Sequence, residues 1–277
     1  MLKNRIIPVI LLREGVIIQS FNFKDYSRIG NPFNIIRRLS KWMSDEIIYL
    51  NISKPDKKFS LGRSDLNVES SEFEKFEEII ELISKHSLCP ITFGGSINTI
   101  EKINLYLSKG ADKISINSKA IEDPNFISDA ANKFGSQCII VSIDYLKENG
   151  KNYVIYKGKK KTNLDLLEWC RKCQDLGCGE ILVNCINNDG KKNGYDIETL
   201  NILEKELDIP IIALGGAGSA HHFEELFNKT GIKAAAAANL FHHLEQADFN
   251  IKKYLFDKKY NIRRPEFFDI DIIKGNK

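Results

Sequence analysis

Two glycine-rich segments each follow a short run of β-branched residues and are suited to binding phosphate. They are Gly94-Gly95-Ser96 and Gly215-Gly216-Ala217-Gly218. Glycines directly after a strand let backbone N–H groups face an anion, and the N-terminus of the next helix adds its dipole. The following runs end in Asn117-Ser118 and Ala238-Asn239, which could complete the two sites; the alternative is a pair of ordinary tight turns. We therefore expect two phosphate sites, built from Gly95, Ser96, Asn117 and Ser118 and from Gly215, Gly216, Ala238 and Asn239.

Further polar residues stand where predicted strands end. Asp144 ends one run, Asp189-Gly190 follow the next, and Asn51 ends an earlier one. In a barrel of parallel strands such positions form the active site, although each residue could instead cap a helix. Catalysis is favoured for Asp144, because Tyr145-Leu146 begins a hairpin strand and not a helix. Asp189 lies in Asn187-Asn188-Asp189-Gly190, which is also an ordinary turn sequence.

Four charged residues stand at the opposite ends of the predicted strands. Arg5, Glu46, Lys113 and Glu180 begin the first, second, fourth and sixth runs. If their side chains point inward they must pair, because an isolated buried charge is prohibitively costly. Judged from the residue types alone, the four charges are interpreted as a structural plug that seals the floor of a barrel.

Neither a metal site nor a cofactor site is expected. Six cysteines lie mostly in apolar or helical contexts: Cys89, Cys138, Cys170, Cys173, Cys178 and Cys185. One Cys-x-x-Cys has no second pair, whereas a tetrahedral zinc site needs four convergent ligands. The doublets His221-His222 and His242-His243 point their rings to different faces of a helix. Cys185 has no evident histidine to activate it, so we interpret it as a lining residue.

The elements that must position these residues alternate between short apolar runs and amphipathic stretches, which is typical of βα units. Eight runs are predicted as strands: Arg5 to Leu12, Glu46 to Ile52, Pro90 to Phe93, Lys113 to Asn117, Cys138 to Asp144, Glu180 to Cys185, Pro210 to Leu214 and Ala234 to Ala238. Each is followed by a plausible helix, such as Phe73 to His86. A (β/α)8 barrel needs about 250 residues. The 277 residues therefore predict an α/β TIM barrel as a single domain over 1–277.

Three segments interrupt this alternation. Gly15 to Phe23 is predicted as an extra strand, and Lys147-Glu148-Asn149-Gly150 as a hairpin turn with an Asn-Gly signal. Ser53 to Glu69 is a long polar loop on the catalytic side of the barrel.

An internal repeat relates the two halves of the chain. CPITFGGSIN from Cys89 resembles IPIIALGGAGSA from Ile209, and Pro90 aligns with Pro210, 120 positions later. Two similar half-barrels imply two similar ligand sites on opposite sides of one axis.

The overall composition excludes several classes of function. Forty Lys and Arg against 37 Asp and Glu give a net charge of +3, and no basic stripe rich in aromatic residues indicates nucleic acid. Lys159-Lys160-Lys161 is predicted as a loop. No apolar stretch approaches the length of a membrane span, and the N-terminus lacks a signal-peptide pattern, so we expect a cytoplasmic protein without a membrane partner.

Taken together, the segments RIIPVILL, FGSQCIIVSID, GCGEILVNCINNDGKKNGYD and PIIALGGAG resemble the cyclase subunit of imidazole glycerol phosphate synthase over nearly the whole chain. The resemblance implies a barrel that receives ammonia from a glutaminase subunit docked on its floor and binds a substrate with two phosphates at the opposite end. It implies that Arg5, Glu46, Lys113 and Glu180 form a charged gate, with Asp45 and Asp112 near the partner. It also assigns Asp189 and Gly190 to the second phosphate site.

The sequence departs from this family in one pocket. The family uses two aspartates as general acid and base; Asp144 matches one, but Leu11 occupies the other position, and leucine cannot transfer protons. Gln19 replaces a lysine and Asn51 an aspartate. The pattern resembles a divergent branch associated with glycosyl amidation in surface polysaccharide synthesis, whose members supply ammonia to a separate, asparagine-synthetase-like amidotransferase.

Three hypotheses remain open from the sequence. The first is an ammonia-channelling barrel of the amidation branch. The second is a true cyclase of histidine biosynthesis that recruits another group in place of the carboxylate missing at Leu11. The third is a non-catalytic scaffold that binds a phosphosugar.

Overall fold

Eight parallel strands close into a barrel in the computed structural model, which describes residues 3–21, 25–30, 32–41, 44–53, 76–243 and 246–265. The barrel strands are β1 (Arg5–Arg13), β4 (Ile47–Asn51), β5 (Ile91–Gly94), β6 (Lys113–Ile116), β7 (Ile139–Glu148), β10 (Glu180–Cys185), β11 (Ile211–Leu214) and β12 (Ala234–Ala237). Each pairs in parallel with its neighbours, and β12 returns to β1 with Ala234 opposite Arg5. The predicted TIM barrel is therefore confirmed.

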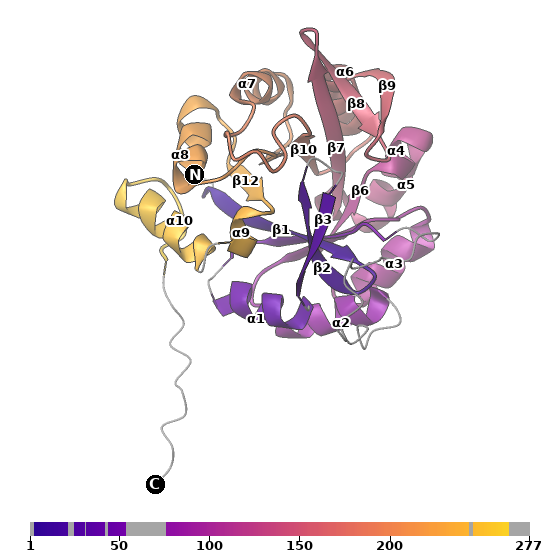
Figure 1. The fold of residues 1–277 in the computed structure, drawn as a ribbon. Coiled ribbons are helices and arrows are strands. Elements are labelled where there is room, and N and C mark those ends of the chain that lie inside the picture. The colour runs from indigo at the N-terminus through magenta and orange to yellow at the C-terminus, as the bar shows by residue number, and fades with distance from the viewer. Residues whose placement is uncertain are drawn as a thin grey trace.

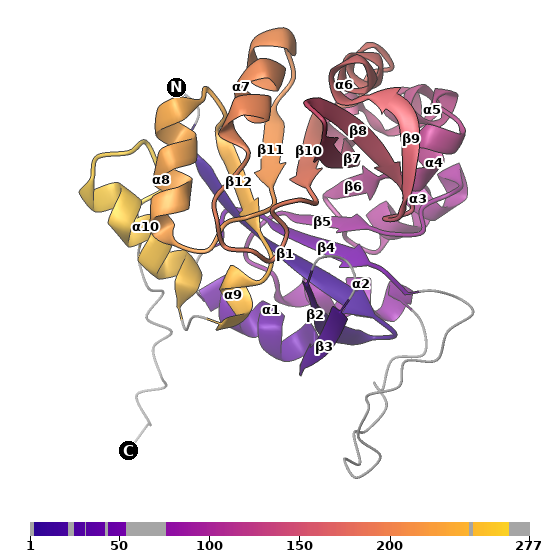
Figure 2. The same cartoon turned by 45° about the horizontal axis from the view of Figure 1, so that its top comes forward.

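Helices cover the outside of the barrel, as Figures 1 and 2 show. They are α1 (Pro32–Lys41), α2 (Phe76–His86), α3 (Ile100–Ser108), α4 (Ser118–Glu122), α5 (Asn125–Phe134), α6 (Leu166–Asp175), α7 (Ile197–Glu206), α8 (Ala220–Lys229), α9 (Leu240–His243) and α10 (Ala247–Asp257), with a 3₁₀ turn at Ser136–Cys138. Helix α2 buries Ile79, Ile80 and Ile83, the apolar face expected from their spacing. In the described part of the chain, no helix is long and apolar enough to cross a membrane.

The predicted strand ends agree with the structure to within one residue, except that β7 continues to Glu148. The start of the predicted helix at Phe73 lies outside the described residues, as does the predicted loop beyond Ser53.

Two antiparallel excursions leave the barrel at its C-terminal end. The predicted extra strand is β2 (Val16–Phe21), which pairs with β1 and with β3 (Asp25–Gly30). The predicted end at Phe23 lies outside the described residues. The predicted turn joins β7 to β8 (Lys151–Tyr156), with Asn149 and Gly150 at φ of 50° and 73°, as a type I′ hairpin requires. The loop prediction for Lys159-Lys160-Lys161 is wrong from Lys160 onward, because Lys160 starts β9 (Lys160–Asp165), which pairs with β8.

The interior of the barrel is itself a packed apolar core. Side chains alternate between the two faces of a strand, so every second residue of β1 from Arg5 to Leu11 points to the lumen. The lumen core consists of Ile7, Val9, Ile48, Ile140, Leu182, Ile212, Leu214, Ala234 and Ala236, with Leu11, Leu50 and Ala238 packed against it. A separate, larger core fills the space between the strands and the helices.

Candidate active site

A closed ring of four charges lies at the N-terminal end of the barrel. Arg5 bridges the two glutamates, at 2.8 Å to Glu46 and 2.7 Å to Glu180. Lys113 bridges the same two, at 3.2 Å and 3.0 Å. Glu46 is 2 % exposed and also accepts a hydrogen bond from Thr92 Oγ1 at 2.9 Å. The four side chains therefore do pair, and each carboxylate holds both cations.

The electrostatics of the ring follow from this geometry. Burial alone would lower the pKa of Arg5, but the charges and hydrogen bonds of Glu180 and Glu46 outweigh it and raise that pKa. The attraction within a buried ion pair offsets the free-energy cost of desolvating its charges only when each charge is fully hydrogen-bonded, as in this ring.

Asp45 and Asp112, which precede two ring residues in the chain, stabilise the ends of strands. Asp45 accepts the backbone N–H of Ile6 and pairs with Lys252 at 2.9 Å. Asp112 accepts the backbone N–H of Ile91 at 2.8 Å. Both lie at the floor with side chains bonded within the chain, and their nearness to a partner stays a prediction.

Asp144 lies at the opposite end of the barrel between two amide donors. Asn117 Nδ2 donates to its Oδ2 at 2.9 Å, and Asn184 Nδ2 donates to its Oδ1 at 2.8 Å. Burial raises the pKa of Asp144, and the two amides act against that rise by stabilising the charged form. The sequence reasoning missed Asn184, although its position four residues after Glu180 places it on the inward face of β10.

Leu11 and Asn51 lie at the end of the barrel that holds Asp144, and their contacts limit which of them could transfer protons there. Leu11 packs against the lumen core, so the wall on which it lies is apolar. Asn51 Oδ1 accepts from Ser53 N at 3.0 Å and from Ser53 Oγ at 2.6 Å. This contact is an Asx-type turn and not the helix cap considered as the alternative for Asn51, and it holds Ser53 at the end of the described segment.

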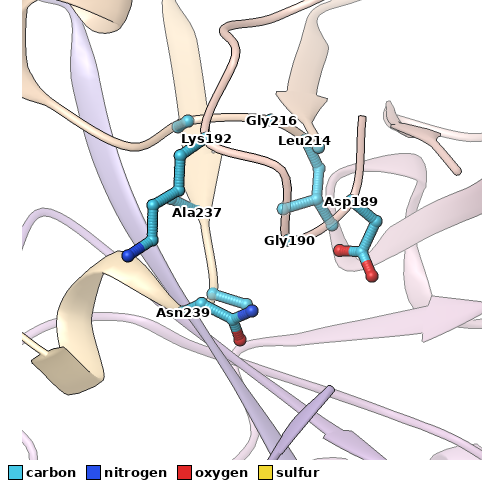
Figure 3. A pocket seen from close by; sticks show the side chains of 10 residues that line it. Asp189, Gly190, Lys192, Leu214, Gly216, Ala237 and Asn239 are labelled. Atoms are coloured by element: carbon cyan, nitrogen blue, oxygen red, sulfur yellow. The ribbon is translucent and has the colours of Figure 1, made fainter. Parts of the chain in front are cut away.

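The glycine-rich segment after β11 forms a pocket with the loops after β10 and β12. The pocket is lined by Asp189, Gly190, Lys192, Leu214, Gly215, Gly216, Ala217, Ala237, Ala238 and Asn239 (Figure 3). Gly215 and Gly216 have φ of +100° and +98°, and a Cβ on Gly216 would lie 2.0 Å from the carbonyl oxygen of Gly194. Only glycine fits there, because the backbone of Gly194 packs directly against it. Six predicted residues thus line one pocket: Asp189, Gly190, Gly215, Gly216, Ala238 and Asn239.

Strand β2 borders the same pocket. Asn239 Nδ2 donates to the carbonyl oxygen of Ser20 at 2.8 Å, so this amide binds the protein backbone. A Cβ on Gly190 would lie 3.4 Å from the ring of Phe21. Gln19, in the same strand, is buried at 3 % exposure.

Lys192 is a pocket residue that the sequence reasoning missed. Its backbone has φ of +59°, and its side chain and that of Asp189 lie on opposite sides of Gly190 in Figure 3. A lysine two residues after a predicted phosphate-binding glycine was the available signal. It adds a positive charge to a pocket whose other ionisable group is acidic.

The first half of the barrel repeats the glycine geometry. Gly95 has φ of +100°, as Gly215 does, and a Cβ there would lie 1.9 Å from the carbonyl oxygen of Asn51. Ser96 follows at the end of β5, while Asn117 and Ser118 follow the neighbouring β6. The side-chain amide of Asn117 donates to Asp144. Asn117 therefore links the predicted first phosphate site to the predicted catalytic carboxylate.

The six cysteines are free thiols. Burial raises the pKa of Cys185, so this thiol is neutral at physiological pH and unsuited to nucleophilic attack. His222 Nδ1 accepts the backbone N–H of Gly218 at 3.0 Å, and His221 pairs with Glu224. Within the described ranges, no group of three or more His, Cys, Asp or Glu residues could hold a metal ion.

Comparison with known proteins agrees with this architecture. Residues 5–246 match the family model described as histidine biosynthesis protein. A protein of Vibrio vulnificus, provisionally named imidazole glycerol phosphate synthase subunit hisF2, is 38 % identical over 99 % of this chain and 97 % of its own length. The HisF subunits of Streptococcus mutans and Lactococcus lactis are 36 % and 38 % identical, each over 95 % of this chain and over 100 % and 97 % of their own lengths. The chain therefore belongs to the HisF family of imidazole glycerol phosphate synthase subunits.

Proposed function

We propose that this chain is an ammonia-receiving synthase subunit, in which ammonia enters at the floor and passes through the lumen to the end that holds Asp144. The observation that carries the proposal is the closed ring of Arg5, Glu46, Lys113 and Glu180 at one end of an apolar lumen, with Asp144 at the other end. A glutaminase subunit of the HisH type, docked on the floor, is the proposed source.

The lumen suits neutral ammonia better than ammonium. Its walls include the aliphatic side chains of Ile7, Val9 and Ile48 and the alanines of β12. A cation would lose its hydration there without gaining a counter-ion, whereas ammonia carries no net charge. The ring keeps bulk water out until its side chains move.

The proposed ligand at this end of the barrel is a phosphorylated small molecule. The cradle at Gly215 and Gly216 and the matching turn at Gly95 and Ser96 lie at the same end of the barrel as Asp144. Lys192 would neutralise part of the charge of a phosphate in the first cradle. Asp144, held by two amides, is the proposed proton acceptor of the reaction.

The end chemistry that we propose is ammonia supply for glycosyl amidation in surface polysaccharide synthesis. Leu11 presents an apolar side chain where the cyclisation reaction uses a carboxylate, and Asn51 is bound to Ser53. The ring, by contrast, is complete. Ammonia delivery is thus retained while the cyclisation machinery is altered, and an asparagine-synthetase-like amidotransferase is the proposed consumer.

A reconstituted assay tests this proposal. The tagged chain is co-expressed with a glutaminase subunit, and the complex is assayed for glutamate release and for turnover of the histidine-pathway substrate, PRFAR. We expect stimulated glutamine hydrolysis without cyclisation. Cyclisation of PRFAR at rates comparable with those of a HisF subunit would refute the amidation role, and the absence of any stimulation would refute the ammonia-receiving role.

A second candidate function is cyclisation itself, in the histidine pathway. It is favoured by the names of the relatives, which match this chain over nearly its whole length. The discriminating test is growth of a histidine auxotroph that lacks its own HisF and carries this chain with its glutaminase. Rescue supports the cyclase, and failure to grow despite soluble protein supports amidation.

A further inference from the structure

Asp189 differs from Asp144 in its hydrogen bonding. Both carboxylate oxygens of Asp144 accept a hydrogen bond from an amide. Asp189 Oδ2, by contrast, is buried with no hydrogen-bond partner among the residues that the structure describes. A buried and unpaired carboxylate oxygen is costly when charged, so this position favours a protonated carboxyl or a carboxyl bonded to a ligand.

The position of Asp189 places it against whatever anion the cradle holds. It lines the same pocket as Gly215, Gly216 and Asn239. An ionised carboxylate there would repel a phosphate, whereas a neutral carboxyl can donate a hydrogen bond to it. A protonated Asp189 is therefore the state in which this pocket holds an anion without repulsion from the carboxyl.

The ionisable groups around Asp189 come from several elements. Asp144 faces it from β7, Tyr26 from β3, and Lys192 lines the pocket from the same loop. His222 on α8 contacts Gly218 at the edge of the cradle. Burial, and to a lesser degree the charge of Asp144, raise the pKa of Asp189 to about 6. Two neighbouring carboxyls in unlike surroundings are the usual basis for separate acid and base roles.

We propose that Asp189 is the proton-donating carboxyl of this pocket, and that it supplies from the loop after β10 the proton transfer that Leu11 cannot perform. One proton passes from the Asp189 carboxyl to the bound ligand, and the Asp144 carboxylate accepts one from it. The pair returns to its starting state by exchange with water. The inference rests on the phosphate cradle of the proposed function and is independent of the amidation role.

Sulfate binding tests this inference without knowledge of the acceptor. Sulfate remains a dianion between pH 5 and pH 8, so any change in its affinity reports on the protein. By isothermal titration calorimetry, we expect the wild-type chain to bind sulfate about ten-fold more weakly at pH 8 than at pH 5, because Asp189 loses its proton. In Asp189→Asn, and in the smaller Asp189→Ser, the affinity should be the same at both pH values.

Two controls isolate the carboxyl. His222→Gln should keep the pH dependence of the wild-type chain, which excludes the imidazole as its source. Asp208→Asn makes the same charge change at an exposed position and should also keep it. Two results would overturn the role of Asp189 but leave the cradle standing. One is a sulfate affinity of the wild-type chain that does not change with pH, and the other is a pH dependence that persists in both Asp189 variants. No sulfate binding at any pH would overturn the cradle as well.

Discussion

Replacing Asp189 with asparagine should stabilise the fold at alkaline pH and progressively less toward acid pH. The pKa of Asp189 is raised from an ordinary 3.8 to about 6 by burial and by Asp144. Each pKa unit corresponds to about 1.4 kcal/mol, so ionising the buried carboxyl above pH 6 costs about 3 kcal/mol relative to the unfolded chain. Because the side chain is partly accessible and the loop can relax, we expect about 2 kcal/mol.

The sign follows from proton binding. Between pH 3.8 and about 6 the folded chain holds a proton on Asp189 that the unfolded chain has released, so the contribution of Asp189 to stability falls as pH rises through this window. Below the window both states are protonated and asparagine has no advantage. Above it the full cost applies, and the isosteric asparagine removes it.

Urea unfolding followed by circular dichroism measures this difference. The free energies of unfolding of the wild-type chain, Asp189→Asn and the exposed control Asp208→Asn are compared at pH 4.5 and pH 8. We expect Asp189→Asn to gain about 2 kcal/mol at pH 8 and roughly a third of that at pH 4.5, where the unfolded chain has already released most of this proton, and the control to gain none at either pH. An equal gain at both values, or a loss at pH 8, would refute the assignment of a raised pKa to Asp189.

The remaining predictions concern the ring, the cradle and the proton acceptor. Glu46→Gln should lower the free energy of unfolding by about 3 kcal/mol, measured with urea, because it breaks contacts to both cations of a largely buried ring; an unchanged midpoint would contradict this. Gly215→Ala should cost about 2 kcal/mol, since φ is +100° and the new Cβ would lie 2.7 Å from the carbonyl oxygen of Cys185, and it should abolish sulfate binding in the same calorimetric assay. Lys192→Met should weaken sulfate binding at pH 5 without changing stability; equal affinity would place the lysine outside the site. In a complex reconstituted with both the glutaminase and the proposed amidotransferase, Asp144→Asn should reduce formation of the amidated product about 10²- to 10⁴-fold while glutamate release persists, and retention of full product formation would show that Asp144 transfers no proton.

The barrel strands could be predicted from the sequence because each is a short apolar run between helical stretches. Strands β3 and β9 could not, because Asp25–Gly30 and Lys160–Asp165 lack an apolar run. They form because β2 and β8 offer hydrogen-bonding edges, which is a property of the neighbouring strand and not of their own residues.

In the candidate site, the residues that could be predicted from the sequence are those whose place depends only on their position along one strand. Three ring residues begin a strand and Glu46 directly precedes one, so their meeting at one rim follows from parallel topology. The hydrogen bond from Asn184 to Asp144 depends on register between β7 and β10. The electrostatic coupling of Asp189 to Asp144 depends on how the loop after β10 folds back. The spacing of residues in the sequence does not predict that loop conformation.

The two halves of the barrel share a backbone, but their chemistry is unequal. The turns at Gly95 and Gly215 have the same φ, whereas Asp144 and Asp189 both belong to the half that begins at β7, and the matching position on β1 is Leu11. On the proposed roles, one copy of a duplicated scaffold has lost its proton-transfer group and serves as a wall and an anion-binding turn. Substitutions in the first half should therefore alter ligand binding, whereas the second half holds both a cradle and the proposed proton-transfer groups, so substitutions there can alter either binding or reaction.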